Sequence, residues 1–238
     1  MVIHWVPHHR FNRASLINVG FLHVRSAEGD RDCDYVGVHD VDLLPINEEL
    51  SYEFPSKGPF HVAAPGLHPR YEYPSFLGAI LLMKVTDFEL VKGMSNQYWG
   101  WGMEDDEFYH RLKDARLEVQ RPEGIKTGTK DTFLHIHGPR KHARDFQMCY
   151  NQRDKTRRRD RLGGFHTVDY EMASVQHMTV DGHHFQLLNV QLKCDKDETP
   201  WCDCRDAPQS EARVKPIRKE DDIRPHLGKN RGIVQKKN

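Results

Sequence analysis

The segment at residues 98–108 combines aromatic and acidic side chains in a pattern that suits chemistry on sugars. It reads Tyr-Trp-Gly-Trp-Gly-Met-Glu-Asp-Asp-Glu-Phe, so two tryptophans stand just ahead of an acidic run. Aromatic faces pack against sugar rings, and a carboxylate held beside a substrate accepts a hydroxyl proton as a general base. A solvated acidic helix start is the alternative, but such a charge run seldom follows Trp-Gly-Trp-Gly directly. We therefore interpret the segment as part of a catalytic site.

The acidic residues are predicted to lie at the start of a helix. Phe108, Leu112 and Ala115 recur at spacings of four and three, which predicts a helix over residues 104–115 with one apolar face. Asp105 and Asp106 then lie in the first turn, where amide N–H groups and the helix dipole favour negative charge. The helix is expected to present its carboxylates at one end while its apolar face packs in a core.

A second acidic motif, Asp40-Val41-Asp42, follows the apolar strand predicted at residues 35–39. Alternation along a strand points Asp40 and Asp42 the same way, so both could reach one ligand. Carboxylate oxygens suit a hard cation such as Mn²⁺ or Mg²⁺, which in turn bridges diphosphate oxygens. The alternative is a turn in which the aspartates bind local amides.

A pair of histidines, His135 and His137, has the same period-two spacing, with Ile136 predicted on the opposite face. Together with Asp42 they would make a mixed nitrogen and oxygen site, which favours Mn²⁺ over Mg²⁺. A surface strand without a metal is the alternative for this motif taken alone. Its occurrence beside the two acidic motifs favours the metal site.

Periodicity along the rest of the chain predicts an α/β fold, because strand-like and helix-like segments alternate. The strand at residues 76–83 is apolar enough to lie in the centre of a sheet. We predict helices at residues 14–21 and 86–92, and strands at residues 35–39, 60–64, 76–83, 117–120, 132–137 and 185–192.

Two segments are predicted to lie outside the core. Between His137 and Gly164 the chain is polar and strongly basic with few apolar residues, which indicates a mobile flap. From Arg205 onward it is charged and contains prolines, which is typical of a disordered tail. We therefore expect a catalytic domain at residues 1–204 and a tail at residues 205–238.

Composition excludes several kinds of partner. The chain has 238 residues, and Lys+Arg and Asp+Glu both total 35, so no net field favours nucleic acid or an anionic membrane. No apolar run reaches the ~18 residues that a membrane span requires. The first nine residues have too short an apolar segment for a signal peptide. We expect no nucleic-acid partner and no membrane span.

The cysteines give two possible readings of the compartment. Cys194, Cys202 and Cys204 cluster late in the chain, while Cys33 and Cys149 stand alone. A bridge between Cys194 and Cys202 would close a short loop and fits an oxidising lumen. Reduced thiols of a cytosolic protein are the alternative. A zinc site is disfavoured, because only one residue separates Cys202 from Cys204.

Taken together and in this order, motifs over roughly residues 11–202 resemble the beta-1,4-galactosyltransferase family. Within it the chain is most similar to the members that build the proteoglycan linker, which have His-x-His in place of a Met/His metal pair. The motifs are Phe11-Asn12-Arg13-Ala14, Asn18-Val19-Gly20-Phe21, Asp40-Val41-Asp42-Leu43-Leu44-Pro45, Gly58-Pro59-Phe60-His61-Val62-Ala63, Gly93-Met94-Ser95-Asn96, residues 98–107, His135-Ile136-His137, and Thr199-Pro200-Trp201 between Cys194 and Cys202.

The resemblance implies a glycosyltransferase-A fold and an inverting, Mn²⁺-dependent transfer of galactose from UDP-galactose to O4 of xylose on proteoglycan core proteins. It implies that Asp105 is the general base, and that the basic stretch after His137 folds over the bound donor. The implied metal ligands are Asp42, His135 and His137. The implied donor-binding residues are Phe11, Arg13, Asp40, Asp42, Tyr71 and Trp101, and the implied acceptor-binding residues are Tyr73, Trp101, Glu104 and Asp106.

The sequence departs from the family pattern at three places. Residues 1–10 do not supply the Pro-x-Arg-x-Arg-like first strand that grips uridine diphosphate, so we expect that strand to be missing. Ala79 stands where the family usually has the second glycine of a pair, so its methyl group could take up room beside a sugar or phosphate. The tail after Cys204 matches nothing in the family.

These departures leave alternatives for the function. A sugar- or partner-binding remnant without catalysis is one, because the first donor-binding strand is expected to be missing. A metal-dependent hydrolase is another, but it would leave the two tryptophans without a role. The resemblance also implies a type II membrane protein of the Golgi apparatus, although we expect the anchor to be absent from this chain.

Overall fold

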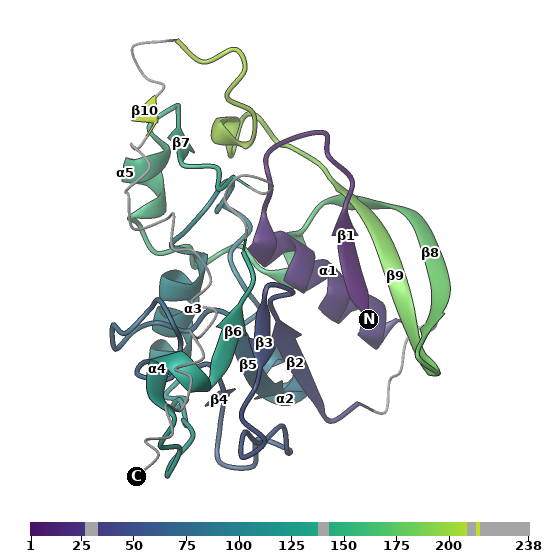
Figure 1. Cartoon of the computed structure of the whole chain (residues 1–238). Coiled ribbons are helices and arrows are strands. Elements are labelled where there is room, and N and C mark those ends of the chain that lie inside the picture. Colours follow the sequence, from purple (N-terminus) through teal and green to yellow (C-terminus); the bar gives the residue numbers. More distant parts are fainter. Residues whose placement is uncertain (27–32, 138–142, 209–212, 215–238) are drawn as a thin grey trace, which may run out of the picture.

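The structure is a computed structural model that describes residues 1–26, 33–137, 143–208 and 213–214, and it confirms the α/β architecture (Figure 1). No helix in these ranges has the length and apolar character needed to cross a membrane. The helices are α1 (Arg13–Arg25), α2 (Val85–Leu90), α3 (Glu104–Asp114), α4 (Gly128–Asp131) and α5 (Gln152–Thr156), with 3-10 turns at Phe165–Thr167 and Pro200–Cys202. The strands are β1 (Val2–Trp5), β2 (Tyr35–His39), β3 (Leu43–Pro45), β4 (Phe60–His61), β5 (Ile80–Lys84), β6 (Phe133–His135), β7 (Gln147–Met148), β8 (Tyr170–Val180), β9 (His183–Leu192) and β10 (Arg213–Val214).

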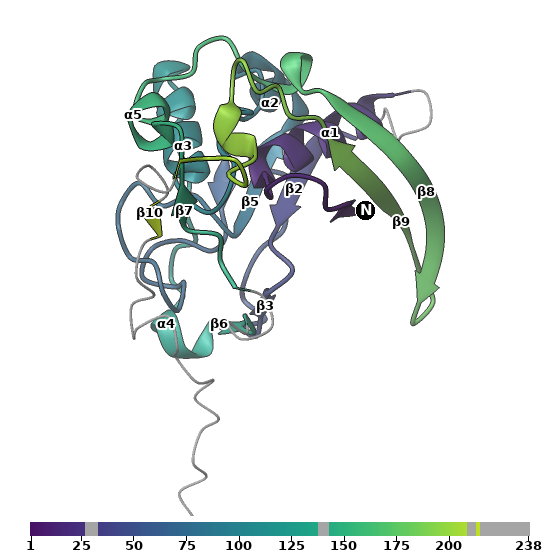
Figure 2. The same ribbon diagram turned by 90° about the horizontal axis from the view of Figure 1, so that it is seen from above.

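Helix α1 lies between two sheets and packs against both (Figures 1 and 2). On one side Phe21 joins the core around β5, and on the other Val19 joins the core around β9. The side chain of Asn12 accepts a hydrogen bond from the backbone N–H of Ser15 at 2.9 Å, which fixes the start of the helix. The predicted helix is therefore confirmed and extends four residues further than expected, to Arg25.

Strand β5 is the central strand of an antiparallel sheet with the order β2–β5–β4, as its apolar sequence predicts. It begins at Ile80 rather than at residue 76, because Ala79 has a φ of 68°, in the left-handed region that a strand cannot contain. The side chain of Ala79 is only 5% exposed and belongs to the core cluster that contains Phe76. Its methyl group is therefore part of the core rather than an obstruction in an open site.

Three more of the predicted strands differ from expectation, and one of them, β6, covers Phe133–His135 instead of residues 132–137. Strand β4 ends at His61 rather than at residue 64. Residues 117–120 form no strand in the described structure, where they make a single bridge between Gln120 and Phe60. The carbonyl of Gln120 accepts the backbone N–H of His61 at 2.9 Å, so this segment still lies alongside β4.

Strands β8 and β9 form a long antiparallel hairpin that curves away from the rest of the domain (Figure 2). The sequence predicts β9 but not β8. The turn between them has Asp181 at a φ of 50° and Gly182 at a φ of 79°, so the Asp-Gly pair is the signal that predicts this hairpin. Strand β1 pairs in parallel with β9, so a strand does precede Phe11, although residues 2–5 contain no arginine.

The predicted flap is in part packed against the domain. Residues 138–142 lie outside the described residues, but Gln152 and Asp160 are buried. The amide of Gln152 donates to the carbonyl of Trp99 at 2.6 Å, and Arg111 of α3 donates to the carbonyl of Asp160 at 2.8 Å. These contacts are polar, which is why a search for apolar residues does not reveal them.

Two disulfides hold the end of the domain. The Cys194–Cys202 bridge is confirmed, whereas Cys149, which the sequence leaves unpaired, is joined to Cys204. The sequence offers no partner for Cys149, because the fold, not the spacing, brings residues 149 and 204 together. Beyond Cys204, β10 pairs with β7, so two residues of the predicted tail belong to a sheet. Residues 209–212 and 215–238 of that tail lie outside the described residues.

Removing the two disulfides is expected to destabilise the fold unequally. The bridges join residues 55 and 8 positions apart, and a longer closed loop restricts the unfolded chain more. We expect the double substitution Cys149→Ala/Cys204→Ala to lower the free energy of unfolding by about 4 kcal/mol and Cys194→Ala/Cys202→Ala by about 2.5 kcal/mol. Denaturant unfolding under oxidising conditions measures both, with Cys33→Ala, which lies outside both bridges, as the control. The reverse ranking would contradict this assignment.

Candidate active site

The acidic residues of the predicted catalytic segment lie in the first turn of α3. Glu104, Asp105 and Asp106 begin the helix directly after Met103, which has a φ of 75°. Phe108, on the same helix, is buried in the core and anchors the helix to it. The three carboxylates therefore share a helix start whose amide groups and dipole favour negative charge.

Arg13 of α1 joins the start of α3 to the residue that follows β2. Two of its nitrogens lie 2.8 Å from one carboxylate oxygen of Asp40, and a third lies 3.8 Å from Glu104. Burial alone would lower the pKa of Arg13, but Asp40, Glu104 and Asp105 together raise it. Arg13 is therefore a fixed positive charge at the centre of an acidic cluster.

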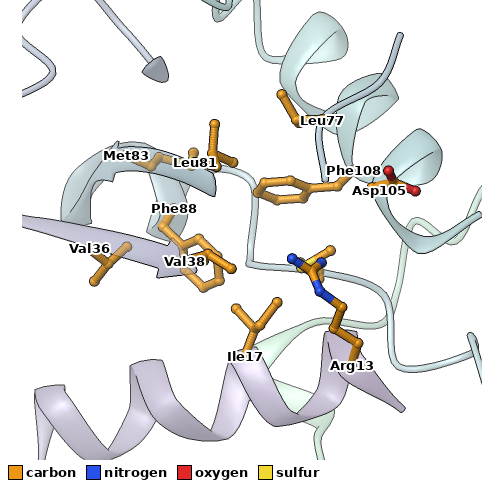
Figure 3. A pocket seen from close by; sticks show the side chains of 11 residues that line it. Arg13, Ile17, Val36, Val38, Leu77, Leu81, Met83, Phe88, Asp105 and Phe108 are labelled. Atoms are coloured by element: carbon orange, nitrogen blue, oxygen red, sulfur yellow. The ribbon is translucent and has the colours of Figure 1, made fainter. Parts of the chain in front are cut away.

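Asp105 has the properties of a general base that works near neutral pH. Burial first, and then the charges of Glu104 and Asp106, raise the pKa of Asp105 to about 7, while Arg13 opposes the shift. Figure 3 shows Arg13 reaching from α1 toward α3, where Asp105 lies beside Phe108. Both charged residues line one part of a cavity of about 10 Å³ whose other walls are almost entirely apolar. The apolar surroundings explain the cost of ionising this carboxyl group.

The predicted sugar-binding tyrosines form an aromatic cluster beside the carboxylates. Tyr71 and Tyr73 both lie against Phe76, with ring centroids 4.9 and 5.6 Å away. Burial, followed by the nearby Asp105 and Asp106, raises the pKa of Tyr73, which places its hydroxyl in their field. Tyr73 remains 39% exposed, so its ring offers a free face next to the candidate base.

His68 supports this cluster, although no motif in the sequence points to it. Its ring is buried and stacks on Tyr71 at 5.0 Å. The Nδ1 atom accepts the backbone N–H groups of Arg70 and Tyr71 at 3.1 and 3.2 Å, so the proton of the neutral ring is on Nε2. His68 thereby fixes the turn that presents Tyr71.

Trp101 is the exposed tryptophan of the pair, whereas Trp99 is buried. Its indole is 41% exposed and packs edge-on against Phe146 at 4.9 Å, with the guanidinium of Arg144 over the ring at the same distance. Its backbone N–H donates to the carbonyl of Asp145 at 2.8 Å. The basic stretch therefore supplies one wall around this aromatic residue.

Two further predicted residues border the cluster. Phe11 is 40% exposed, lies 5.6 Å from Trp5, and accepts the N–H of Gly100 with its carbonyl at 2.8 Å. The carboxylate of Asp106 accepts a hydrogen bond from Ser75 at 3.2 Å. The fold thus joins Phe11 to the glycine-rich loop and Asp106 to the segment that carries the tyrosines.

The three predicted metal ligands come together through the pairing of β3 with β6. One oxygen of Asp42 lies 3.1 Å from His137 Nδ1 and 3.6 Å from His135 Nε2. The Nε2 atom of His137 is buried without a hydrogen-bond partner. No three His, Cys, Asp or Glu side chains in the described ranges are already arranged to hold a metal ion. The donor set nevertheless fits Mn²⁺, because two imidazoles and one carboxylate are available side by side.

The two aspartates of the Asp-Val-Asp motif face different partners, which corrects the sequence interpretation. Residues 40–42 form a turn rather than the end of a strand, and Val41 is 80% exposed. Asp40 consequently pairs with Arg13, while Asp42 points to His135 and His137. Strand alternation does not apply in a turn, so the prediction of a shared direction is wrong, while the two histidines do face one partner.

Arg10 holds the segment that packs around Trp101. In the sequence, only its position directly before Phe11 points to such a structural role. Its guanidinium donates to the carboxylate of Asp145 at 2.6 Å, to the carbonyl of Gln147 at 2.6 Å and to the carbonyl of Trp201 at 2.8 Å. These bonds join Asp145, whose carbonyl accepts the N–H of Trp101, to Trp201 in the disulfide-linked end of the domain. Arg10 therefore anchors the described part of the basic stretch.

The chain is similar to known galactosyltransferases. A family model described as the N-terminal domain of galactosyltransferase matches residues 58–138. Beta-1,4-galactosyltransferase 7 of Drosophila melanogaster is 52% identical over 85% of this chain and 62% of its own length. Xylosylprotein 4-beta-galactosyltransferase of Caenorhabditis elegans is 46% identical over 81% of this chain and 66% of its own length.

A solved structure is similar over most of both chains. The crystal structure of a mutant Drosophila beta-1,4-galactosyltransferase 7 in complex with manganese, UDP-Gal and xylobiose has a TM-score of 0.80 and 50% identity, covering 85% of this chain and 84% of that chain. The chain therefore belongs to the beta-1,4-galactosyltransferase family and has its glycosyltransferase-A-like fold. It spans about 60% of the length of the Drosophila relative.

The raised pKa of Asp105 predicts how the stability of the fold depends on pH. The folded state keeps the proton up to about pH 7, whereas the unfolded state loses it near pH 4, so this contribution to stability is complete below about pH 4 and is lost as the pH rises through about 7. The asparagine in Asp105→Asn does not ionise, so this variant does not lose stability as the pH rises through about 7. We expect its stability relative to the wild type to increase by about 4 kcal/mol between pH 4 and pH 8, since each of the roughly three pKa units of the shift corresponds to about 1.4 kcal/mol.

Thermal and denaturant unfolding at both pH values measure this difference. Asp169→Asn, at an exposed carboxylate paired with Lys193, is the control and should show no such change. An Asp105→Asn stability difference that does not vary with pH would mean that Asp105 is not held protonated by its surroundings.

Proposed function

We propose that this chain transfers galactose, with inversion, from UDP-galactose to O4 of xylose on proteoglycan core proteins, and that the reaction depends on Mn²⁺. The observation that carries the proposal is the carboxylate of Asp105, which has a pKa near 7 and interacts electrostatically with both Arg13 and Tyr73. The relatives support the donor, the metal and the sugar acceptor, because one solved structure contains manganese, UDP-Gal and xylobiose.

Asp105 is the proposed general base. The xylose hydroxyl attacks the anomeric carbon of galactose, a new C–O bond forms, and the bond to the diphosphate breaks with its electron pair leaving on UDP. Asp105 takes the hydroxyl proton as the bond forms, a contribution of about 10²–10⁴ in rate. Its pKa of about 7 suits this task, since a base is most effective when its pKa is near the working pH.

Arg13 and the aromatic residues are proposed to position the two substrates. The fixed charge of Arg13 lies where an anionic donor would be attracted, and Asp40 holds its guanidinium in place. Phe11, with its exposed ring, would pack against the nucleotide. The exposed rings of Tyr73 and Trp101 offer faces for sugar rings, so that binding lowers the entropic cost of bringing the reacting atoms together.

The remaining polar groups are proposed to bind sugar hydroxyls. Glu104 and Asp106 flank Asp105, and a carboxylate is an acceptor for hydroxyl hydrogen bonds. Tyr71, fixed by His68, would wall the donor sugar. Neighbouring carboxylates also keep the pKa of Asp105 raised, so sugar binding and proton transfer depend on the same cluster.

Asp42, His135 and His137 would hold Mn²⁺. An ion bound there would neutralise the negative charge that develops on the departing UDP. The unpartnered Nε2 atom of His137 and the proximity of Asp42 to both rings support this assignment.

We also propose that the protein works in the Golgi apparatus, as the resemblance implies. The two disulfides fit an oxidising compartment of the secretory pathway. A binding remnant without catalysis is the competing function. Transfer is favoured because the candidate base, the basic residue and the metal-binding side chains are all present.

Asp105→Asn is expected to lower transfer by about 10²–10⁴-fold, because the amide cannot accept the hydroxyl proton. Transfer by the wild type should increase as the pH rises through about 7, where Asp105 ionises. Release of UDP with UDP-galactose, Mn²⁺ and a xyloside acceptor measures both. Asp169→Asn should retain wild-type activity. A variant Asp105→Asn that keeps most of its rate would refute the base assignment, and a wild type that releases no UDP would favour the binding remnant.

Asp42→Asn is expected to weaken Mn²⁺ binding and donor binding together, each by at least about 10-fold, because the metal loses its only carboxylate in the proposed site. Asp105→Asn should leave Mn²⁺ affinity unchanged and serves as the matched control. Calorimetric titration with Mn²⁺, followed by UDP, measures the two affinities. Equal Mn²⁺ affinity of Asp42→Asn and the wild type would place the metal elsewhere.

A further inference from the structure

We propose that His61 is a positioning residue that, through the carbonyl of Gly78, fixes the backbone against which the carboxylate of Asp105 lies. The inference rests on the proposed function of Asp105 and adds a residue that the transfer chemistry does not itself use. His61 belongs to the sequence motif Gly58-Pro59-Phe60-His61-Val62-Ala63, which contributes none of the residues proposed to bind substrate or metal.

The position of His61 leaves its ring one polar partner. The side chain is fully buried, and its Nε2 atom lies 2.9 Å from the carbonyl oxygen of Gly78. Burial lowers the pKa of His61 to about 4, so the ring is neutral at physiological pH. A carbonyl only accepts, so the ring proton is on Nε2 and His61 donates to Gly78.

The other ring nitrogen shows that packing alone does not explain a histidine at this place. The Nδ1 atom is buried and has no hydrogen-bond partner in the described structure. A buried polar atom without a partner costs about 1–3 kcal/mol, which an apolar side chain of similar size would avoid. The hydrogen bond to Gly78 is the feature that only a donor at position 61 supplies.

Gly78 in turn touches the candidate base. A Cβ atom at this position would lie 2.9 Å from Asp105 Oδ2 and 2.8 Å from the ring of Phe76, so there is no room for a side chain. Asp105 therefore packs directly on the backbone of Gly78. Movement of this backbone would change both the position and the burial of the carboxylate.

The backbone at Gly78 and Ala79 is strained, and the carbonyl of each residue accepts a hydrogen bond. Ala79 has a φ of 68°, a conformation that costs a residue with a side chain about 1–2 kcal/mol. The carbonyl of Gly78 accepts from His61, and the carbonyl of Ala79 accepts the N–H of Asp40 at 2.9 Å. His61 and Asp40 thus hold the strained segment by hydrogen bonds to two adjacent carbonyls. The same segment lies against Asp105, so it links the candidate base to Asp40.

The test compares two substitutions of His61 by an amide side chain, glutamine and asparagine, which differ in how far the amide nitrogen extends from the backbone. In His61→Gln the amide nitrogen takes the place of Nε2 and can still donate to Gly78, whereas in His61→Asn it takes the place of Nδ1 and cannot. We expect kcat to fall about 10- to 100-fold in His61→Asn and less than about 5-fold in His61→Gln, with KM for the xyloside changed by less than about 3-fold in both. Val62→Ala, a neighbouring buried residue, is the control for lost stability and should keep its kcat.

A second measurement does not depend on transfer. Carbon-13 NMR titration of the Asp105 carboxyl should show its pKa shifted by about 0.5 or more in His61→Asn, and unchanged within that limit in His61→Gln and Val62→Ala. If the wild type transfers no galactose, the proposed function fails and this titration alone decides the inference. The inference is overturned if His61→Asn matches Val62→Ala in kcat, or, where kcat cannot be measured, in the titration of Asp105.

Discussion

The ion pair between Arg13 and Asp40 is the interaction on which the site depends. Arg13 projects from a helix that is packed between two sheets, and Asp40 follows the strand at the edge of one of them. Because Arg13 also reaches Glu104, a single guanidinium connects three elements that are distant in the sequence. Its positive charge partly offsets the mutual repulsion of the carboxylates around Asp105. An acidic cluster of this density needs such a charge to remain compact.

Much of the fold and of the site could be predicted from local patterns. The helix at the acidic motif follows from the spacing of Phe108 and Leu112, and the central strand follows from its continuous apolar run. Among the motif residues found through the family resemblance, Arg13 contacts Asp40 and Glu104, and Asp42 lies beside His135 and His137. Sequence patterns succeed here because each of these elements carries its own periodicity or motif.

The parts that could not be predicted depend on long-range contacts. The pairing of Cys149 with Cys204 and the anchoring of the basic stretch by Arg10 are set by the fold, and neither leaves a local pattern. The different directions of Asp40 and Asp42 depend on a turn that looks like a strand end in the sequence. His61 resembles any core histidine until its single hydrogen bond is seen beside the candidate base.

The parallel pairing of β1 with β9 has a consequence for how the protein is made. Residues 2–5 lie alongside residues 187–190, so the first strand cannot find its partner until nearly the whole domain has left the ribosome. Contacts between such distant residues form slowly, because the chain loses the entropy of a long loop before these contacts can stabilise it. The helix that carries Arg13 packs on this same sheet. The face of this helix that packs on β9 therefore stays uncovered until residues 183–192 have been synthesised.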